Sequence, residues 1–183
     1  MQIYKIVIVI NVVKAKAPKT CIISQNALYS LPKSKCKTMA IVNLYLNFKG
    51  NCETAFNYYK SVFGGEFTYI GKFKEMPPQE GMPPMSKEMG EQIMHVSLPI
   101  SKETSLSGSD VGDEYAAQFK QGNNFSISVS AASKEEADKL FNGLSAGGTV
   151  MMPLSQTFWS EYFGMCTDKF GINWMIGYDK NPM

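Results

Sequence analysis

Arginine is absent from this chain of 183 residues, and lysine supplies all 18 of its fixed positive charges. Arginine carries the planar, bidentate donor group with which proteins read bases and grip phosphates. The lysines nearly balance 16 acidic residues, to a net charge of +2, and they are scattered along the chain. We therefore expect no nucleic acid partner.

Recognisable metal-site and disulfide patterns are missing as well. The four cysteines (Cys21, Cys36, Cys52 and Cys166) include no CxxC pair and show no metal-ligand spacing. Unpaired thiols of this kind are typical of a reducing compartment, so we expect a cytoplasmic protein. The β-branched run at 6–13 is far shorter than the roughly 20 apolar residues that span a bilayer, and we expect no membrane partner.

Residues 1–38 lack the regular pattern of the rest of the chain. The run at 6–13 is about long enough for a signal-peptide core, but Lys14, Lys16 and Pro18 surround the only plausible cleavage site and argue against secretion. Met39 opens a well-patterned strand. We therefore expect 1–38 to be an N-terminal extension, mostly disordered, and 39–183 to be the folded domain.

From Met39 onward, strand and helix patterns alternate. A predicted strand at 41–48 leads to Asn51, a candidate N-cap for a helix at 52–63, which ends at a Gly-Gly pair. The remaining predictions for this half are strands at 66–73, 92–99 and 104–108, and a Pro- and Met-rich loop at 75–90.

The same order then repeats after a connector at 111–122. A strand at 124–131 precedes a capping box at 133–136, a helix, a second Gly-Gly pair and a strand at 149–154. The stretch 156–178 holds both tryptophans and predicts a hairpin, with strands at 158–167 and 172–178 joined by a turn at 168–171. The predicted fold class is α+β, with tandem βαβββ units at 39–110 and 123–183.

Four blocks of sequence resemble one family in the expected order. The blocks Tyr45–Phe67, Ile93–Ile100, Gly108–Asp110 and Thr157–Ile176 are similar to the PhnB-like branch of the vicinal-oxygen-chelate superfamily, which includes glyoxalase I, bleomycin-resistance proteins and extradiol dioxygenases. The resemblance implies a single glyoxalase/bleomycin-resistance-like domain with a U-shaped sheet cup, and a homodimer. Members of this branch have often carried a demethylubiquinone methyltransferase label, which the sequence does not support, because no Gly-rich turn follows a first parallel strand.

Metal-dependent members of the superfamily place His or Glu ligands on the first and last strands of each unit. The corresponding inward positions of this sequence are Tyr45, Asn47, Ser107, Ser126, Ser128, Asn173 and Met175. None of these is a strong ligand for a divalent transition metal, and Asp110 could add one oxygen at most. We therefore expect no metal and no other cofactor, with a divalent metal as the disfavoured alternative.

His95 is the only histidine of the chain. Strand alternation places it on the face of Ser97, opposite Val96 and Leu98. Because imidazole titrates near neutral pH, His95 is our first candidate for a general base, although a hydrogen-bonded structural role is the commoner one. Glu161 is the candidate to assist it. Asp168, just before the turn, is interpreted as structural.

Two classes of function fit these observations. The first is a metal-independent protein that binds a small molecule in an aromatic-lined cup. Its predicted ligand-binding residues are Tyr45, Asn47, His95, Ser128, Trp159 and Phe163. The second is a glyoxalase- or dioxygenase-like enzyme with His95 as base or metal ligand and Glu161 or Asp110 assisting. The loop methionines suit either a lid or a contact with a partner subunit. They are Met76, Met82, Met85 and Met89.

If residues 1–38 lie outside the domain, a chain that begins at Met39 should keep the thermal midpoint of the full chain within a few degrees. Calorimetry on the two forms measures this difference. Aggregation or loss of a cooperative transition in the shorter chain would mean that the extension belongs to the core.

Overall fold

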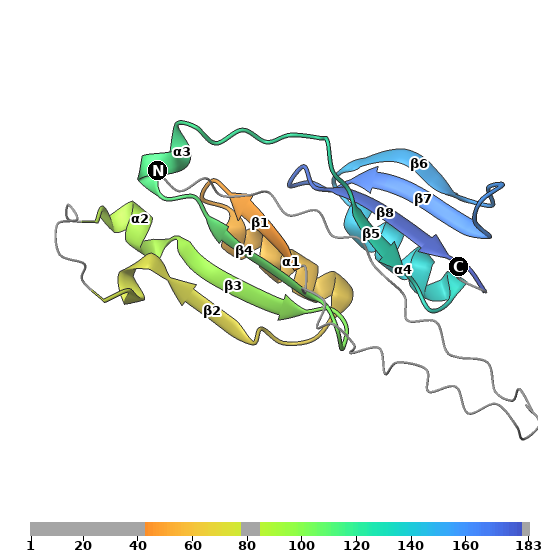
Figure 1. The fold of residues 1–183 in the computed structure, drawn as a ribbon, viewed down its shortest axis with the longest axis horizontal. Helices are drawn as coiled ribbons and strands as arrows, with labels where there is room; N and C mark the ends of the chain where they lie inside the picture. Colours follow the sequence, from red (N-terminus) through yellow and green to blue (C-terminus); the bar gives the residue numbers. More distant parts are fainter. Residues whose placement is uncertain (1–42, 78–84, 181–183) are drawn as a thin grey trace, which may run out of the picture.

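The computed structural model describes residues 43–77 and 85–180, and the expectations for 1–38 lie outside this part of the chain. The described residues form two βαβββ units in tandem, which confirms the predicted α+β fold (Figure 1). The strands and main helix of the first unit are β1 (Leu44–Phe48), α1 (Cys52–Phe63), β2 (Tyr69–Lys72), β3 (Ile93–Pro99) and β4 (Ser105–Asp110). Those of the second unit are β5 (Ile127–Ser130), α4 (Lys134–Ser145), β6 (Thr149–Ser155), β7 (Tyr162–Thr167) and β8 (Asn173–Tyr178).

Each unit builds a four-stranded sheet with the same topology. The first sheet has the order β1-β4-β3-β2 and the second the order β5-β8-β7-β6. In both sheets the first and last strands of the unit pair in parallel, and the remaining pairs are antiparallel. This agreement between the units supports the repeat that the sequence predicted.

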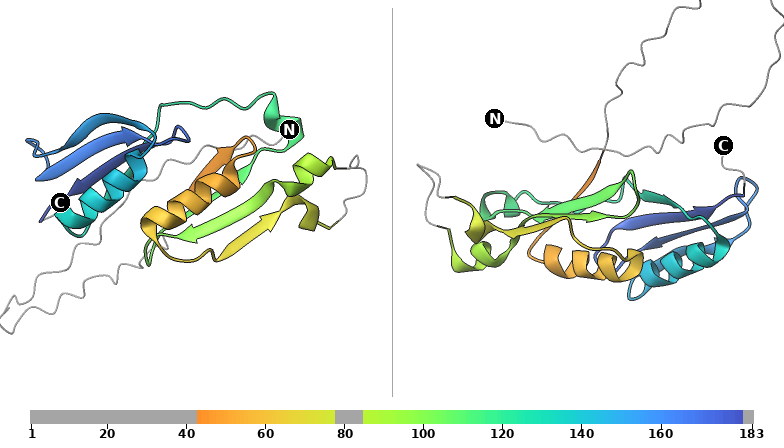
Figure 2. Two further views of the ribbon diagram at one scale, coloured as in Figure 1. Left: turned by 180° about the vertical axis from the view of Figure 1, so that it is seen from behind. Right: turned by 90° about the horizontal axis from the view of Figure 1, so that it is seen from below.

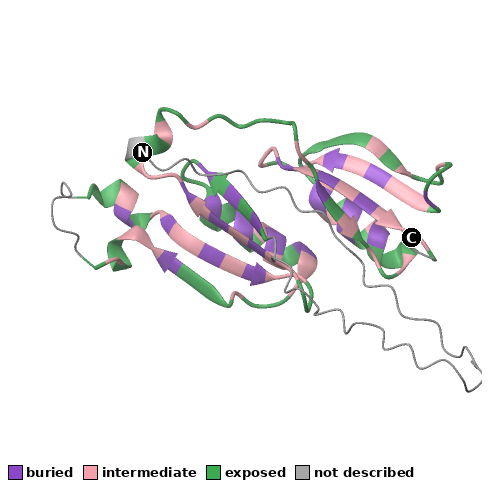
Figure 3. Cartoon of the chain, viewed as in Figure 1, coloured by how far each residue is buried: buried purple, intermediate pink, exposed green. Residues whose placement is uncertain are grey.

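Both main helices cover the same side of the molecule. Figure 2 shows α1 and α4 beneath the two sheets, while the opposite face of each sheet is left without a helix. That absence of a helix applies to residues 43–77 and 85–180, which the structure describes, and we call this opposite side the open face of each sheet. Strand residues alternate between the two sides, so β1 has buried leucines toward α1 and exposed residues on the open face (Figure 3).

Four segments differ from the sequence-based expectations. The strand predicted at 124–131 is confined to Ile127–Ser130. The predicted strand at 158–167 begins only at Tyr162, because the residues before it form a tight loop. The predicted strand at 66–73 is shorter at both ends: β2 begins only at Tyr69, and a 3₁₀ turn at Phe73–Glu75 follows Lys72. The last part of the predicted loop at 75–90 instead forms the start of a short helix, α2 (Lys87–Glu91). The Ser86 side chain caps its first turn. A second short helix, α3 (Asp113–Ala116), lies in the connector at 111–122.

The N-terminus of α1 is capped by a residue far away in the sequence. Asn51 is the N-cap residue, as the sequence predicted, and its carbonyl accepts from Ala55 N–H, but its side chain makes no capping hydrogen bond. Asp110, at the end of β4, accepts instead from the backbone N–H groups of Gly50 (2.8 Å) and Cys52 (3.0 Å) through Oδ1, and from Ile93 N–H (2.9 Å) through Oδ2. A carboxylate at a helix N-terminus also interacts favourably with the helix dipole.

A second buried carboxylate, Asp168, joins the two units. Its Oδ1 accepts from the backbone N–H groups of Phe170 (2.8 Å) and Ile172 (3.0 Å), which confirms its predicted role in the turn. Its Oδ2 accepts from the Tyr59 hydroxyl of α1 (2.8 Å) and from the Trp174 indole of β8 (2.9 Å). The carboxylate therefore binds one side chain from each unit.

The two helices also meet directly. A Cβ added at Gly143 of α4 would lie 2.9 Å from a methyl carbon of Val62 on α1, so only glycine allows this approach. The Tyr58 hydroxyl donates to the Gly143 carbonyl, and the Phe63 ring lies 5.7 Å from the Trp174 ring. Buried side chains of both units accordingly form a single hydrophobic cluster. No helix among the described residues has the length and apolar character needed to cross a bilayer.

Replacing Asp168 with Ala should lower the free energy of unfolding by about 3 kcal/mol or more, because it leaves buried donors from both units without a partner. Urea denaturation measures the loss. Asp113→Ala is the control, since Asp113 is exposed and should change the value by no more than about 0.5 kcal/mol. Equal stabilities for the two variants would contradict the role given to Asp168.

Candidate functional site

The open face of the first sheet carries an aromatic cluster, which consists of Tyr45 on β1, Tyr69 on β2 and His95 on β3. The Tyr45 hydroxyl lies 3.1 Å from His95 Nδ1. The ring centroids of both tyrosines lie 5.6 Å from that of the imidazole. Tyr45 and Tyr69 are 45% and 47% exposed. The cluster is therefore not part of the core, and in a single chain much of it faces solvent.

Small residues around this cluster make room for it. Gly71 lies directly opposite His95 in the β2–β3 pair, and a Cβ there would meet the Tyr69 side chain at 2.5 Å. The absence of a side chain at Gly71 thus allows the Tyr69 ring to lie beside the imidazole. Ser97 and Ser107 hydrogen-bond to each other at 3.2 Å on the same face. This face therefore offers neutral hydroxyl and imidazole groups to a bound molecule.

The open face of the second sheet contains a hollow of about 230 Å³. Three of the predicted ligand-binding residues line it together: Ser128 of β5, Phe163 of β7, and Trp159 from the loop before β7. The Trp159 and Phe163 rings meet edge to face at 5.9 Å. Methionines occupy the neighbouring paired positions Met165 and Met175, so this face is more apolar than that of the first sheet.

The loop that carries Trp159 is held by hydrogen bonds. The Thr157 hydroxyl accepts from Ser160 N–H (3.0 Å), and Thr157 N–H donates to the Ser160 carbonyl (3.0 Å). Asp179, after β8, accepts from the Ser160 hydroxyl (3.1 Å) and from Glu161 N–H (2.8 Å). Trp159 therefore keeps a fixed position although it is 52% exposed.

The predicted site residues fall into two groups on separate sheets. Tyr45 and His95 are in direct contact, and Asn47 follows on the same face of β1, exposed. Ser128, Trp159 and Phe163 make up the second group. Glu161, the candidate to assist His95, is exposed at the start of β7, and no hydrogen bond joins the two among the described residues. One chain alone thus shows no assembled acid–base pair.

Sequence reasoning missed Tyr69, Gly71 and the residues that hold the Trp159 loop. Tyr69 and Gly71 alternate within a predicted strand, so their shared face could be inferred, but their position beside His95 depends on the β2–β3 register. Thr157, Ser160 and Asp179 act through hydrogen bonds that no local pattern reveals.

Comparison with known proteins now identifies the family. The model of the 3-demethylubiquinone-9 3-methyltransferase family matches residues 40–177. This chain belongs to that family.

Relatives within the PhnB-like family support this assignment. Protein YjdN of Escherichia coli (strain K12) is 33% identical over 138 residues, which are 74% of this chain and 93% of YjdN. The crystal structure of PA1353 from Pseudomonas aeruginosa is 36% identical, with a TM-score of 0.65, over 78% of this chain and 100% of that one. A PhnB protein from Bacillus cereus is 25% identical, with a TM-score of 0.58, over 74% and 97% of the two chains. Solved glyoxalase/bleomycin resistance/dioxygenase proteins share the fold at lower identity.

The residues of this PhnB-like chain do not fit the divalent metal known in other members of the superfamily. The described residues contain no group of three or more His, Cys, Asp or Glu side chains that could hold a metal ion. Asp110, the one carboxylate proposed as a possible ligand, is buried and binds three backbone N–H groups. Its oxygens are therefore committed to the fold.

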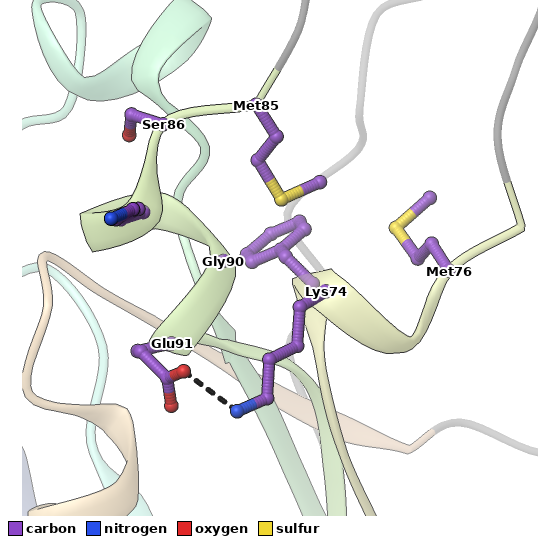
Figure 4. A pocket seen from close by; sticks show the side chains of 8 residues that line it. Lys74, Met76, Met85, Ser86, Gly90 and Glu91 are labelled. Carbon is purple, nitrogen blue, oxygen red and sulfur yellow. Dashed lines mark hydrogen bonds and ion pairs between the residues drawn. The ribbon is translucent and has the colours of Figure 1, made fainter.

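A larger hollow of about 600 Å³ lies away from both open faces, beside α2 (Figure 4). Phe73, Met76 and Met85 form its apolar lining. The Glu91 carboxylate beside it pairs with Lys74 at 2.6 Å, and hydrogen bonds from Lys74 and then Lys72 hold the pKa of Glu91 below its ordinary value. Met76 and Met85 thus face this hollow, while Met82 lies outside the described residues.

The two tryptophans should differ sharply in their effect on stability. Trp174→Leu should cost about 3–5 kcal/mol, because the indole is fully buried between the units and its N–H binds Asp168. Trp159→Leu should change the free energy of unfolding by no more than about 0.5 kcal/mol, since it lies half exposed in a loop. Urea denaturation compares them, and similar losses would mean that Trp159 is part of the core.

Proposed function

We propose that this protein binds an uncharged, planar small molecule, without a metal, in a cup that two copies of the chain build together. The observation that carries the proposal is the composition of the open faces. Each face presents aromatic or apolar side chains and neutral polar groups, and large parts of both are exposed in a single chain.

The scarcity of charge on these faces supports an uncharged ligand. One carboxylate, Asp179, lines the hollow of the second sheet, and it already accepts hydrogen bonds from the Ser160 hydroxyl and from Glu161 N–H. The registers of the strand pairs show which residues of each described strand lie on the open face. No Asp, Glu or Lys of these strands lies there, and His95 is the only ionisable residue besides tyrosine. The first sheet offers hydroxyls and imidazole, and the second offers Phe163 and methionines. A molecule with one polar edge and one apolar face would complement the two surfaces when they are brought together.

A second copy of the chain is the occupant that fits the exposed surface. Both open faces lie on the same side of the molecule, so they do not face each other within one chain (Figure 2). A twofold axis would place the first sheet of each copy over the second sheet of the other, and it would form two identical cups. It would also cover Phe158, which is 95% exposed in one chain.

Methyl transfer, the activity in the family's name, is not what we propose. The N-terminus of α1, which follows the first strand, is already occupied by the Asp110 carboxylate, and the sheet around it is mainly antiparallel. That site therefore lacks the open Gly-rich turn of a doubly wound nucleotide-binding fold.

We propose a cytoplasmic location. Free thiols at Cys52 and Cys166, both buried, are compatible with it.

The experiment tests binding and the shared cup at once. Fluorescence titration with neutral bicyclic aromatic ketones should give saturable changes in tryptophan emission, because Trp159 lines the second-sheet wall. Tyr69→Leu in the first sheet and Trp159→Leu in the second should each weaken binding by about 1–3 kcal/mol. Light scattering should give twice the single-chain mass of 20.3 kDa.

Mixing the two variants distinguishes a shared cup from a cup within one chain. In a mixed dimer, one cup combines two unaltered walls, so about one site per mixed dimer should regain full affinity. A cup built by one chain would show no recovery. A monomeric mass, or no saturable binding by any compound, would overturn the proposal.

A further inference from the structure

We infer that Tyr45 fixes His95 in the tautomer that carries its proton on Nε2, so that His95 offers a hydrogen-bond donor to an acceptor oxygen of an uncharged aryl ketone or a related ligand. The ligand half of this inference rests on the proposed function. The tautomer half rests on the ligand-free chain alone.

The contact between Tyr45 and His95 determines which nitrogen is the acceptor. A neutral imidazole has one N–H and one lone-pair nitrogen, and Nδ1 is the nitrogen that lies 3.1 Å from the Tyr45 oxygen. Tyrosine keeps its hydroxyl proton at neutral pH, and partial burial raises the pKa of Tyr45 further. The Tyr45 proton is then left to donate to Nδ1.

The rings around the imidazole hold this arrangement. Tyr45 stacks on His95 with an interplanar angle of 22°, and Tyr69 lies at the same centroid distance of 5.6 Å with an angle of 37°. The Tyr69 ring reaches this position because Gly71 has no side chain. With Nδ1 accepting from Tyr45, the remaining polar atom of the imidazole is the Nε2–H group. A donor flanked by aromatic rings suits a planar molecule that carries a carbonyl oxygen.

This assignment separates His95 from the role of general base. A base needs a lone pair directed at the substrate, and here the lone pair of the neutral ring is already bound by Tyr45. His95 then positions a ligand and does not take its proton. The prediction for the ligand is equally specific: it must accept a hydrogen bond, and a hydrocarbon of the same shape should not engage His95.

The tautomer can be read directly, because the chain contains a single histidine. Proton–nitrogen correlation spectra of the isotope-labelled full chain, at about pH 8 and above the ordinary imidazole pKa, should show an unprotonated, hydrogen-bonded Nδ1 and a protonated Nε2. Tyr45→Phe keeps the ring but removes the hydroxyl, and should shift the Nδ1 resonance to that of a nitrogen without a donor. A proton on Nδ1 in the wild-type chain, or no change in Tyr45→Phe, would overturn the inference.

The ligand class is tested with 1-indanone and with indane, which lacks the oxygen. On the wild-type protein, 1-indanone should shift the Nε2–H signal saturably and indane should leave it unchanged. His95→Phe should weaken 1-indanone binding by about two- to tenfold, the effect of one hydrogen bond, and leave indane binding unaltered. Equal binding of 1-indanone to both proteins would overturn the donor role while leaving the proposed function intact. If neither probe binds the wild-type protein, the ligand half is overturned together with the proposed function, and the spectra still decide the tautomer.

Discussion

The rest of the structure depends on the hydrogen bonds that the Asp168 carboxylate accepts. It accepts hydrogen bonds from two backbone groups of its own turn, from the Trp174 indole and from the Tyr59 hydroxyl of the other unit. A buried carboxylate is stable only when its oxygens are bound in this way. The hydrogen bonds to this one carboxylate thus stabilise the turn, position the Trp174 indole and hold α1 against the second unit.

Asp110 has a comparable role inside the first unit, where it accepts hydrogen bonds from the backbone at the start of α1 and at the start of β3. Both buried carboxylates therefore point into the framework and away from the open faces. This division has a functional consequence. Apart from Asp179, which lines the hollow of the second sheet, the faces proposed to hold the ligand carry uncharged groups. Binding there therefore depends on shape, stacking and single hydrogen bonds, and the tautomer of His95 becomes a determinant of specificity.

Sequence reasoning predicted what local patterns encode. Alternation placed His95 on the face opposite Val96 and Leu98, helical spacing located α1, and turn chemistry gave Asp168 its role. It failed where a residue acts across the chain. Asn51 is the N-cap residue of α1, yet the side chain that accepts from the N–H groups at this end is that of Asp110, at the end of β4, and no local pattern reveals this. The aromatic composition around Trp159 suggested a strand, but the segment is a loop, in which Thr157 accepts from Ser160 N–H and Asp179 accepts from Glu161 N–H.

The position of the two units also follows from Asp168, and it bears on how a cup can close. Turning the open faces toward each other within one chain would pull α1 away from the second unit. That motion would break the Tyr59–Asp168 hydrogen bond and separate Val62 from Gly143. Both are buried contacts, and leaving a buried carboxylate partly unpaired is costly. Closure by a second copy requires neither change. Because the two faces differ, the first with tyrosines, serines and an imidazole and the second with more apolar side chains, each can complement the other face of a symmetric partner. The same interaction that stabilises the single chain therefore favours a site completed from outside it.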